Sequence, residues 1–388
     1  MRILIATSSD YRAFHGQAIF TKNLAEGLVR RGHEILVVAA SRRGTHYEDV
    51  FNGVHVNALK SISLKWLNPN AITALFTDKA MRKIIENFNP EIIHIQDHYP
   101  LSRSALHAAK RSGTKIVGTN HFMPENLAAY IPLISSIKPL YNWILWHWMR
   151  LTFDHLDAVA APSRIAAIIL QENSVRPPVR PISCGANTTI FCPIPDVNRQ
   201  EWRKRYGIEL DKMIFFFVGR VDREKRLDVI LHAATRLNRD DFQVVIAGNG
   251  ANVKKLKKLS QNLGLSKNVL FTGFLPDEDL PSVLNSIDVF IMPSEAELLS
   301  IVTIQAMACG LPVLAADAVA LPELVTDNEN GLLFHPGDVA DAARGMNFFL
   351  DHPESWPAMG LVSLKRSQNH TLDHIVSEYE QFYLSVLG

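Results

Sequence analysis

The sequence predicts an α/β protein built from two doubly wound domains in tandem. Short apolar runs of strand length alternate along the chain with longer segments that have helical periodicity. This alternation occurs twice, once before and once after a proline-rich stretch that runs from Pro177 to Pro195. The 388 residues give enough length for two domains of ordinary size. Such alternation is typical of parallel sheets that are covered by helices on both faces.

The first half contains the elements of one such sheet. Ile3–Thr7 is a short apolar run and the expected first strand. The helix expected at Phe20–Arg31 ends in two arginines followed by Gly32, a cationic last turn and a C-cap glycine. The other elements expected in this half are strand Glu34–Ala40, helix Ala71–Asn87, strand Ile92–Ile95 and strand Lys115–Gly118.

The alternation restarts after the proline-rich stretch. The elements expected there are strand Met213–Val218, helix Leu227–Asn238, strand Gln243–Ala247, helix Ala251–Leu263, strand Asn268–Thr272, helix Leu280–Ser286, strand Val289–Met292, helix Ile301–Cys309 and strand Val313–Ala316. We therefore expect domains at residues 1–185 and 186–388, with the last helix able to pack back on the first domain. A site is expected in the cleft between the two domains.

Composition excludes several classes of protein. Apolar residues make up 47% of the chain and charged residues 20%, which is typical of a folded globular protein and not of a disordered one. No apolar run approaches the roughly 18 residues that a membrane-spanning helix needs. The three cysteines, Cys184, Cys192 and Cys309, are too few and too scattered for a disulfide framework or a zinc site. A reducing cytoplasm is the expected compartment.

Charge is distributed unevenly along the chain. Residues 1–185 hold 21 basic and 13 acidic side chains, which gives a net charge of +8, and the remaining residues carry −7. A basic half favours an anionic partner, such as nucleic acid, a phosphate group or a membrane surface.

The first strand is followed by a long turn, Ser8–Gln17, that contains a single glycine. A dinucleotide-binding turn needs three glycines, so binding of NAD or FAD here is disfavoured. Ligands bind at the carboxyl ends of strands in such sheets, and we expect Gly16 and Gln17 to belong to a substrate-facing loop. The alternative is an ordinary surface loop.

In the second half, Gly219 follows a strand and precedes a cluster of charged residues. Glycine allows the backbone to approach a ligand, and Arg220 and Lys225 supply a planar fork and a point charge. This pair suits a diphosphate. The alternative is a run of solvated charges on the surface.

A polar turn and an apolar helix follow the strand Val289–Met292. The first amides of a helix that begins near Ser300 are unpaired donors and form an anion site. Glu297 lies just before this helix, where its carboxylate can accept hydrogen bonds from hydroxyls, and Gln305 lies further along it. The alternative for Glu297 is an acid that stabilises the helix dipole.

Three histidines lie in or just after strands of the first half. His121 comes after the strand Lys115–Gly118, with Glu125 one helical turn further on. His94 and His98 alternate with Gln96 on one face of a strand, which makes a metal site conceivable, but no third protein ligand is evident. A histidine in such a place more often has a structural role.

Taken together, these residues resemble the retaining GT-B glycosyltransferases of family 4, which use nucleotide-sugar donors. The segments that carry the resemblance are Arg31–Glu34, Ile182–Pro193, Phe217–Lys225, Ala247–Gly250, Glu297–Gln305 and Gly310–Val313. The resemblance implies two Rossmann-like domains that face a central cleft, with the acceptor bound by the first and the nucleotide sugar by the second. It implies no dedicated metal site, no cofactor and no nucleic acid partner.

The resemblance also implies roles for individual residues. Arg220 and Lys225, with Gly219, would hold the donor diphosphate, and Leu299, Ser300 and Ile301 would add backbone amides. Glu297 would bind hydroxyls of the donor sugar, and His121 would line the site near that sugar. Two positions depart from the family pattern, because Gln305 replaces the acid that would hold the ribose and Ser300 replaces a glycine.

Two features favour a lipid acceptor. The segment Pro139–Leu151 holds three of the six tryptophans, and it lies in the basic half. Segments Thr119–Leu127 and Glu295–Ile301 are also similar to bacterial enzymes that glycosylate diacylglycerol. We therefore expect a peripheral, cytoplasmic enzyme that moves glucose or galactose from a UDP-sugar to a lipid on an anionic membrane, with Lys60, Lys65 and Trp66 as a second membrane contact. A soluble acceptor and a non-catalytic nucleotide-sugar-binding protein remain alternatives.

Overall fold

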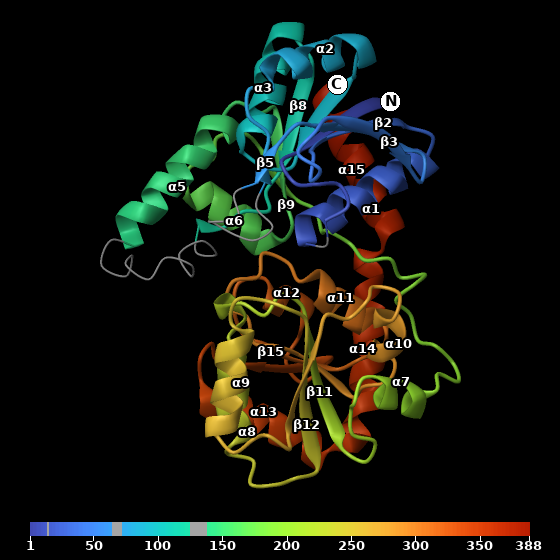
Figure 1. The fold of residues 1–388 in the computed structure, drawn as a ribbon, viewed down its shortest axis with the longest axis vertical. Helices are drawn as coiled ribbons and strands as arrows, with labels where there is room; N and C mark the ends of the chain where they lie inside the picture. The colour runs from blue at the N-terminus through green and yellow to red at the C-terminus, as the bar shows by residue number, and fades with distance from the viewer. Residues whose placement is uncertain (14, 64–71, 125–137) are drawn as a thin grey trace. The chain divides into compact units, whose positions relative to one another are not determined.

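The computed structural model describes residues 1–13, 15–63, 72–124 and 138–388 (Figure 1). The chain forms two compact units. Unit 1 consists of Met1–Gly185 together with Leu372–Gly388, and unit 2 consists of Ala186–Thr371. Each unit is built on its own largely parallel sheet, so the predicted α/β class with two Rossmann-like sheets is confirmed.

Unit 1 contains an eight-stranded sheet in the order β10-β9-β8-β7-β1-β2-β4-β3. All neighbouring strands are parallel except β3, which pairs with β4 in the antiparallel sense and closes one edge. The strands are β1 (Arg2–Thr7), β2 (Glu34–Ala40), β3 (Tyr47–Phe51), β4 (Val54–Leu59), β7 (Ile92–Ile95), β8 (Lys115–Thr119), β9 (Ala158–Ala161) and β10 (Val179–Pro181), and a separate hairpin pairs β5 (Ile62–Ser63) with β6 (Ile72–Thr73). The central strands β1, β7 and β9 are buried on both faces, as continuous apolar runs predict.

The helices of unit 1 are α1 (Gly16–Arg30), α2 (Asp78–Phe88), α3 (Pro100–Ser112), α5 (Lys138–Phe153), α6 (Arg164–Glu172) and the C-terminal α15 (Leu372–Leu387). Helix α15 packs so closely on α1 at Gly27 that a Cβ atom there would lie only 2.4 Å from Cγ2 of Val376. Arg31 and His33 at the end of α1 both bond to Glu380, at 2.6 and 2.7 Å. The last helix of the chain therefore belongs to the layer of helices that packs on the sheet of unit 1.

Unit 2 contains a six-stranded, fully parallel sheet in the order β13-β12-β11-β14-β15-β16. Its strands are β11 (Met213–Val218), β12 (Phe242–Ala247), β13 (Val269–Gly273), β14 (Val289–Met292), β15 (Val313–Ala316) and β16 (Gly331–Phe334). Its helices are α7 (Arg199–Arg205), α8 (Leu227–Ala234), α9 (Val253–Asn262), α10 (Leu280–Leu284), α11 (Ile301–Ala308), α12 (Leu321–Leu324), α13 (Val339–Asp351) and α14 (Trp356–Ser367), with 3₁₀ turns η2 (Arg223–Lys225), η3 (Pro353–Ser355) and η4 (Gln368–His370). Three consecutive phenylalanines of β11 are fully buried and anchor the core.

Two predicted helices differ from the structure at their starts. Helix α1 begins at Gly16, four residues before the predicted Phe20, so Gly16 and Gln17 lie in its first turn and not in a loop. The predicted helix Ala71–Asn87 begins only at Asp78, after the short strand Ile72–Thr73. Ile72 and Thr73 are β-branched, and such side chains are less restricted in a strand than in a helix.

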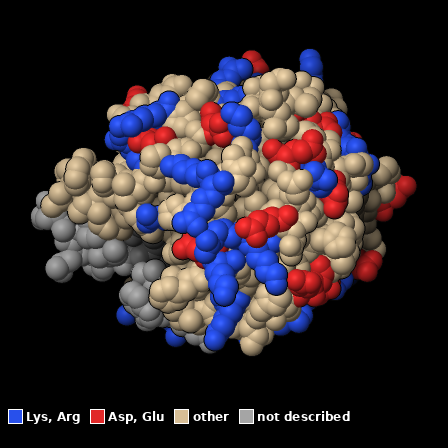
Figure 2. All heavy atoms as spheres, turned by 90° about the horizontal axis from the view of Figure 1, so that it is seen from above, with Lys and Arg blue, Asp and Glu red and all other residues tan. Residues whose placement is uncertain are grey.

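The C-terminal helix reduces the positive charge of unit 1. Helix α15 adds Asp373, Glu378 and Glu380 but no Lys or Arg, so unit 1 as folded carries a net charge of +5. Figure 2 shows Lys and Arg side chains in a band across the middle of one face, with Asp and Glu beside it. None of the helices in the described parts of the chain is long and apolar enough to cross a bilayer.

Candidate active site

Two glycine-containing turns of unit 2 lie against each other at the carboxyl ends of β11 and β12. A Cβ atom on Gly248 would lie 1.9 Å from the carbonyl oxygen of Gly219, and one on Gly250 would lie 2.2 Å from that of Val221. Gly219 and Gly248 also have φ angles of +149° and +123°, which side chains disfavour. The N–H of Val221 donates to the carbonyl of Asn249 at 2.9 Å. The glycines of both motifs are therefore needed for this backbone contact.

Arg220 extends from the first of these turns and is held by two buried carboxylates. Its Nε lies 3.0 Å from Asp222, and its Nη2 lies 2.7 Å from Glu224. Asp222 also accepts the N–H of Ala251 at 2.8 Å, which ties the two turns together. The Arg220 side chain is half exposed, so a phosphate can meet the outer part of a guanidinium whose orientation is already fixed.

Lys225 and Arg226, further along the same turn, pair with the acidic residues that precede α11. Nζ of Lys225 pairs with Oε1 of Glu297, and Arg226 pairs with Glu295. The N–H of Glu295 donates to the carbonyl of Glu224 at 3.4 Å, so backbone contacts hold the two turns together. Lys225 and Glu297 are both largely buried. The structure therefore brings the two residues predicted to hold the diphosphate and the sugar into direct contact.

Ser300 caps helix α11. Its backbone is extended, and its hydroxyl accepts the N–H of Thr303 at 3.3 Å, which is ordinary N-cap geometry. Leu299 and Ile301 lie on either side of this cap and are partly buried. Gln305 is largely buried on α11, and its side-chain amide forms no hydrogen bond with any residue that the structure describes. Serine thus fits where the family pattern has glycine, and the Gln305 amide retains its hydrogen-bonding capacity.

In unit 1, one buried carboxylate organises the loops that follow β1 and β7. Asp97 accepts the N–H and the hydroxyl of Ser8, both at 2.8 Å, and the hydroxyl of Ser102 at 2.7 Å. The amide nitrogen of Gln17 donates to the same carboxylate at 3.0 Å. Gly16 is exposed, with open space where a Cβ would lie. Of the three predicted acceptor-loop residues, Glu125 lies outside the described residues.

His121 lies just beyond β8, at the carboxyl end of the same sheet. Its Nε2 is 2.9 Å from the amide oxygen of Gln96, and its ring packs on Phe20 with the centroids 4.9 Å apart. Burial and, to a smaller extent, the neighbouring His15 together lower the pKa of His121 to about 3. The imidazole is therefore neutral near neutral pH, where it can form hydrogen bonds but carries no charge.

The other two histidines of this region have different surroundings. His94 bonds to Tyr383 and Thr119, whereas His98 lies among aromatic rings that include Trp148, 4.5 Å away, and Phe122, 4.8 Å away. Burial lowers the pKa of His98 to about 4. Within residues 1–13, 15–63, 72–124 and 138–388, no group of three or more His, Cys, Asp or Glu side chains is arranged to hold a metal ion.

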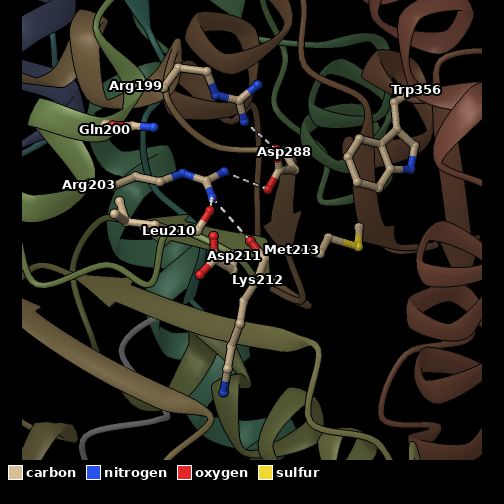
Figure 3. Close-up of a pocket in the computed structure, with 9 residues that line it drawn as sticks. All are labelled: Arg199, Gln200, Arg203, Leu210, Asp211, Lys212, Met213, Asp288 and Trp356. Carbon is tan, nitrogen blue, oxygen red and sulfur yellow. Dashed lines mark hydrogen bonds and ion pairs between the residues drawn. The ribbon is translucent and has the colours of Figure 1, made fainter.

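A hollow of about 320 Å³ lies at the opposite edge of the unit 2 sheet (Figure 3). It adjoins Met213, the first residue of β11, and Asp288, which precedes β14. Arg203 in its wall donates to Asp288 at 2.8 Å and to the carbonyl of Ser286 at 2.8 Å. Ligands of parallel α/β sheets bind at the carboxyl ends of strands, so this hollow is distinct from the candidate site.

Comparisons with known proteins agree with this geometry. Residues 198–360 match the family described as "Glycosyl transferases group 1", and residues 14–190 match "Glycosyltransferase Family 4". The chain is a family 4 glycosyltransferase. The ranges take in both turns of the candidate donor site and the loops that follow β7 and β8.

Relatives of this glycosyltransferase differ in what they act on. One is the alpha-monoglucosyldiacylglycerol synthase of Streptococcus pneumoniae, 24% identical over 86% of this chain and 75% of that protein. Another is the GDP-mannose-dependent alpha-mannosyltransferase of Mycolicibacterium smegmatis, 29% identical over 86% of this chain and 84% of that protein.

Solved structures share the GT-B fold of this glycosyltransferase. The sucrose-phosphate synthase of Thermosynechococcus elongatus has a TM-score of 0.84 at 20% identity, and the match covers 100% of this chain and 99% of that one. Anabaena Alr3699/HepE in complex with UDP-glucose has a TM-score of 0.78 at 18% identity, with coverage of 99% and 100%. The GT-B fold expected from the sequence is therefore confirmed.

Four carboxylates around the candidate residues were not predicted. Asp97, Asp222, Glu224 and Glu295 each bond to a predicted residue or to the residue next to one. All four stand shortly after a strand or beside a basic residue in the sequence. The position of each acid in the sequence could have indicated a role near the site. Only the structure shows which residue each carboxylate binds.

Proposed function

We propose that this glycosyltransferase transfers glucose or galactose from a UDP-sugar to diacylglycerol or a related lipid, with retention of configuration, at the cytoplasmic face of a membrane. Unit 2 would hold the donor and unit 1 the acceptor. The named donor in the Anabaena complex and the named activity of the pneumococcal relative support these choices. The observation that carries the lipid acceptor is the apolar outer face of α5.

Donor binding would exchange the partners of Lys225. Its ammonium group pairs with Glu297, a carboxylate that would otherwise bind sugar hydroxyls. A diphosphate carries more charge than one carboxylate and would replace Glu297 at Lys225. Glu297 would then accept hydrogen bonds from the hexose. In this way one ion pair would prepare both the phosphate contact and the sugar contact.

Charge stabilisation would be the main catalytic contribution of unit 2. Negative charge develops on the diphosphate as the bond to the sugar breaks, and Arg220 and Lys225 would face that charge with their orientation already fixed. His121 would contribute hydrogen bonding and not charge, because its pKa of about 3 keeps it neutral. The donor phosphate itself would assist deprotonation of the acceptor hydroxyl on the face from which it departs.

Helix α5 has apolar side chains on both its inner and its outer face. Trp146, Met149 and Phe153 are buried against unit 1. The residues Leu140, Trp143, Ile144 and Leu151 recur at helical spacing on the outer face, and each is 46–63% exposed. Figure 2 shows few charged side chains over the lobe at its left, where α5 lies in Figure 1. An exposed apolar stripe that contains an indole suits insertion at a membrane interface.

Transfer itself tests the proposal. Vesicles that contain diacylglycerol would be incubated with the protein and either UDP-glucose or UDP-galactose, and lipids would be read by mass spectrometry. We expect one added hexose on the lipid and an equal amount of released UDP. Transfer only to a soluble sugar would contradict the lipid acceptor, and absence of any UDP-sugar turnover would contradict the donor.

Vesicle sedimentation tests the membrane contact separately. Replacing Leu140 and Trp143 with Ser should reduce binding, because both side chains are exposed and lose apolar area at the interface. Leu361→Ser is the matched control, since Leu361 is an exposed leucine of unit 2. Reversing the charge of exposed Lys60, together with Lys65, which lies outside the described residues, tests the electrostatic part. Equal binding of every variant would rule out docking through unit 1.

A further inference from the structure

A chain of hydrogen bonds links His121 to the C-terminal helix within unit 1. Nε2 of His121 lies 2.9 Å from the amide oxygen of Gln96, and the amide nitrogen of Gln96 lies 3.2 Å from Nε2 of His94. Nδ1 of His94 lies 2.9 Å from the hydroxyl of Tyr383 on α15. Gln96, His94 and Tyr383 are all fully buried. The chain thus connects residues of β7, β8 and α15 that lie far apart in the sequence.

A second branch reaches the same helix. The hydroxyl of Thr119 lies 2.8 Å from Nε2 of His94 and 3.0 Å from the hydroxyl of Tyr379. The ring of Tyr379 stacks on that of His94 with the centroids 5.5 Å apart, and it lies 5.5 Å from Phe20, the residue on which His121 packs. Helix α15 therefore contacts the surroundings of His121 through two tyrosines, one turn apart.

The proton positions along the chain follow from its donors and acceptors. An amide oxygen can only accept, so Nε2 of His121 carries the proton that Gln96 accepts. An amide nitrogen can only donate, so Nε2 of His94 is the bare nitrogen and Nδ1 of His94 donates to Tyr383. His121 is then left with Nδ1 as its acceptor nitrogen.

We propose that α15 acts on His121 through Tyr383, His94 and Gln96, and that this chain holds His121 in the Nε2–H tautomer. Nδ1 of His121 then accepts a hydrogen bond from a hydroxyl of a bound sugar, a part that rests on the proposed function. Tyr383, His94 and Gln96 are positioning residues, since they touch His121 and not the substrate. The tautomer itself can be tested without any substrate.

The surroundings of His121 keep it neutral. Burial lowers the pKa of both His121 and His94 to about 3, and His121 also disfavours protonation of His94. The titratable groups around this network are His15, which precedes α1, Tyr379 and Tyr383 of α15, and Cys184 and Glu378, which act on Tyr379. Burial raises the pKa of both tyrosines well above the usual range, so they are uncharged near neutral pH, and His15 contributes to the low pKa of His121.

Nuclear magnetic resonance of the full chain labelled with ¹⁵N-histidine tests the tautomer. We expect a single Nε2–H form of His121 that does not titrate between pH 5 and 8. Gln96→Glu keeps an acceptor at Nε2 but adds a negative charge, so it should raise the pKa of His121 by about two units or more at an unchanged tautomer. A wild-type His121 protonated on Nδ1, or one that titrates near pH 6.5, would overturn the proposal.

A second pair of variants tests the role of α15. Tyr383→Phe removes the acceptor at Nδ1 of His94, so that His94 no longer has to carry its proton on Nδ1. The Gln96 amide is then no longer held in one orientation, and we expect the His121 signal to split between two tautomers. Turnover should fall about three- to tenfold while the affinity for the UDP-sugar stays unchanged. Tyr206→Phe is the matched control, since the Tyr206 hydroxyl donates to Asp279 in unit 2 and lies outside this network. An unchanged His121 spectrum in Tyr383→Phe would overturn the proposal whether or not the enzyme accepts a lipid.

Discussion

The candidate residues of unit 2 and those of unit 1 lie in opposite electrostatic surroundings. In unit 2 the basic residues beside the candidate donor site pair with carboxylates from a neighbouring turn, as in Lys225 with Glu297 and Arg226 with Glu295. In unit 1, His121 belongs to a buried network of neutral hydrogen-bonding groups. Ion pairs can exchange partners when an anion arrives, whereas a neutral buried network resists change because each unpaired group is costly.

This difference indicates a division of labour. Unit 2, which we propose binds the charged diphosphate, keeps its cations paired but partly exposed, so that a stronger anion can take over. Unit 1, which we propose orients neutral hydroxyls, holds its histidine at a low pKa. Mutations should therefore act mainly through charge in unit 2 and mainly through geometry in unit 1.

The largest effect should come from the two cations of unit 2. Arg220→Ala and Lys225→Ala should each lower turnover by about two orders of magnitude or more, since a charged contact to the leaving diphosphate contributes on the order of 2–4 kcal/mol. Steady-state kinetics with UDP-glucose would measure this, and circular dichroism would check the fold. Arg223→Ala is the control, because Arg223 is exposed in the same turn. Near-normal turnover in both test variants would rule out the diphosphate role.

A smaller loss is expected from the glycine contact between the two turns. Gly248→Ala places a Cβ 1.9 Å from a carbonyl oxygen at a φ of +123°, which should lower the free energy of unfolding by about 2–3 kcal/mol. Gly264→Ala has open space at a φ of +73° and should cost only about 1 kcal/mol. Urea denaturation of both variants would show the difference. Equal losses would mean that the close approach of the turns carries no energy.

The smallest effect concerns the ribose. Gln305→Leu should weaken donor binding by about 1–2 kcal/mol, because a ribose hydroxyl would lose its partner. Gln305→Glu should keep or improve affinity, since a carboxylate is the stronger acceptor. Calorimetric titration with UDP-glucose would compare all three proteins. The same affinity in each would show that this position does not touch the nucleotide.

Sequence reasoning located the unit 2 residues better than those of unit 1, and the reason is physical. Arg220, Lys225 and Glu297 lie within short motifs that directly follow strands, so local order places them at the carboxyl edge. The hydrogen-bond chain that holds His121 joins Gln96, just after β7, and His94 of β7 to Tyr383 of α15, more than 250 residues further along the chain. Such pairing depends on how the chain folds back, which no local pattern records. The start of α1 was placed too late because Gly16 is a weak helix former.

The outer face of α5 illustrates a second limit. As a helix, the segment Pro139–Leu151 is apolar on nearly all sides, and a helix of that kind is usually buried. The structure separates the two faces, with Trp146 against the core and Trp143 63% exposed. Only the packing of the neighbouring elements decides which apolar face remains outside.

The central claim is that Arg220 and Lys225 of unit 2 form a clamp for a nucleoside diphosphate. It is tested most directly by calorimetric titration of the protein with uridine, UMP and UDP under one set of conditions. We predict that UDP binds at least about tenfold more tightly than UMP, and that Lys225→Ala removes most of this difference while Arg223→Ala does not. Equal affinities for UMP and UDP, or a difference that survives Lys225→Ala, would contradict the account.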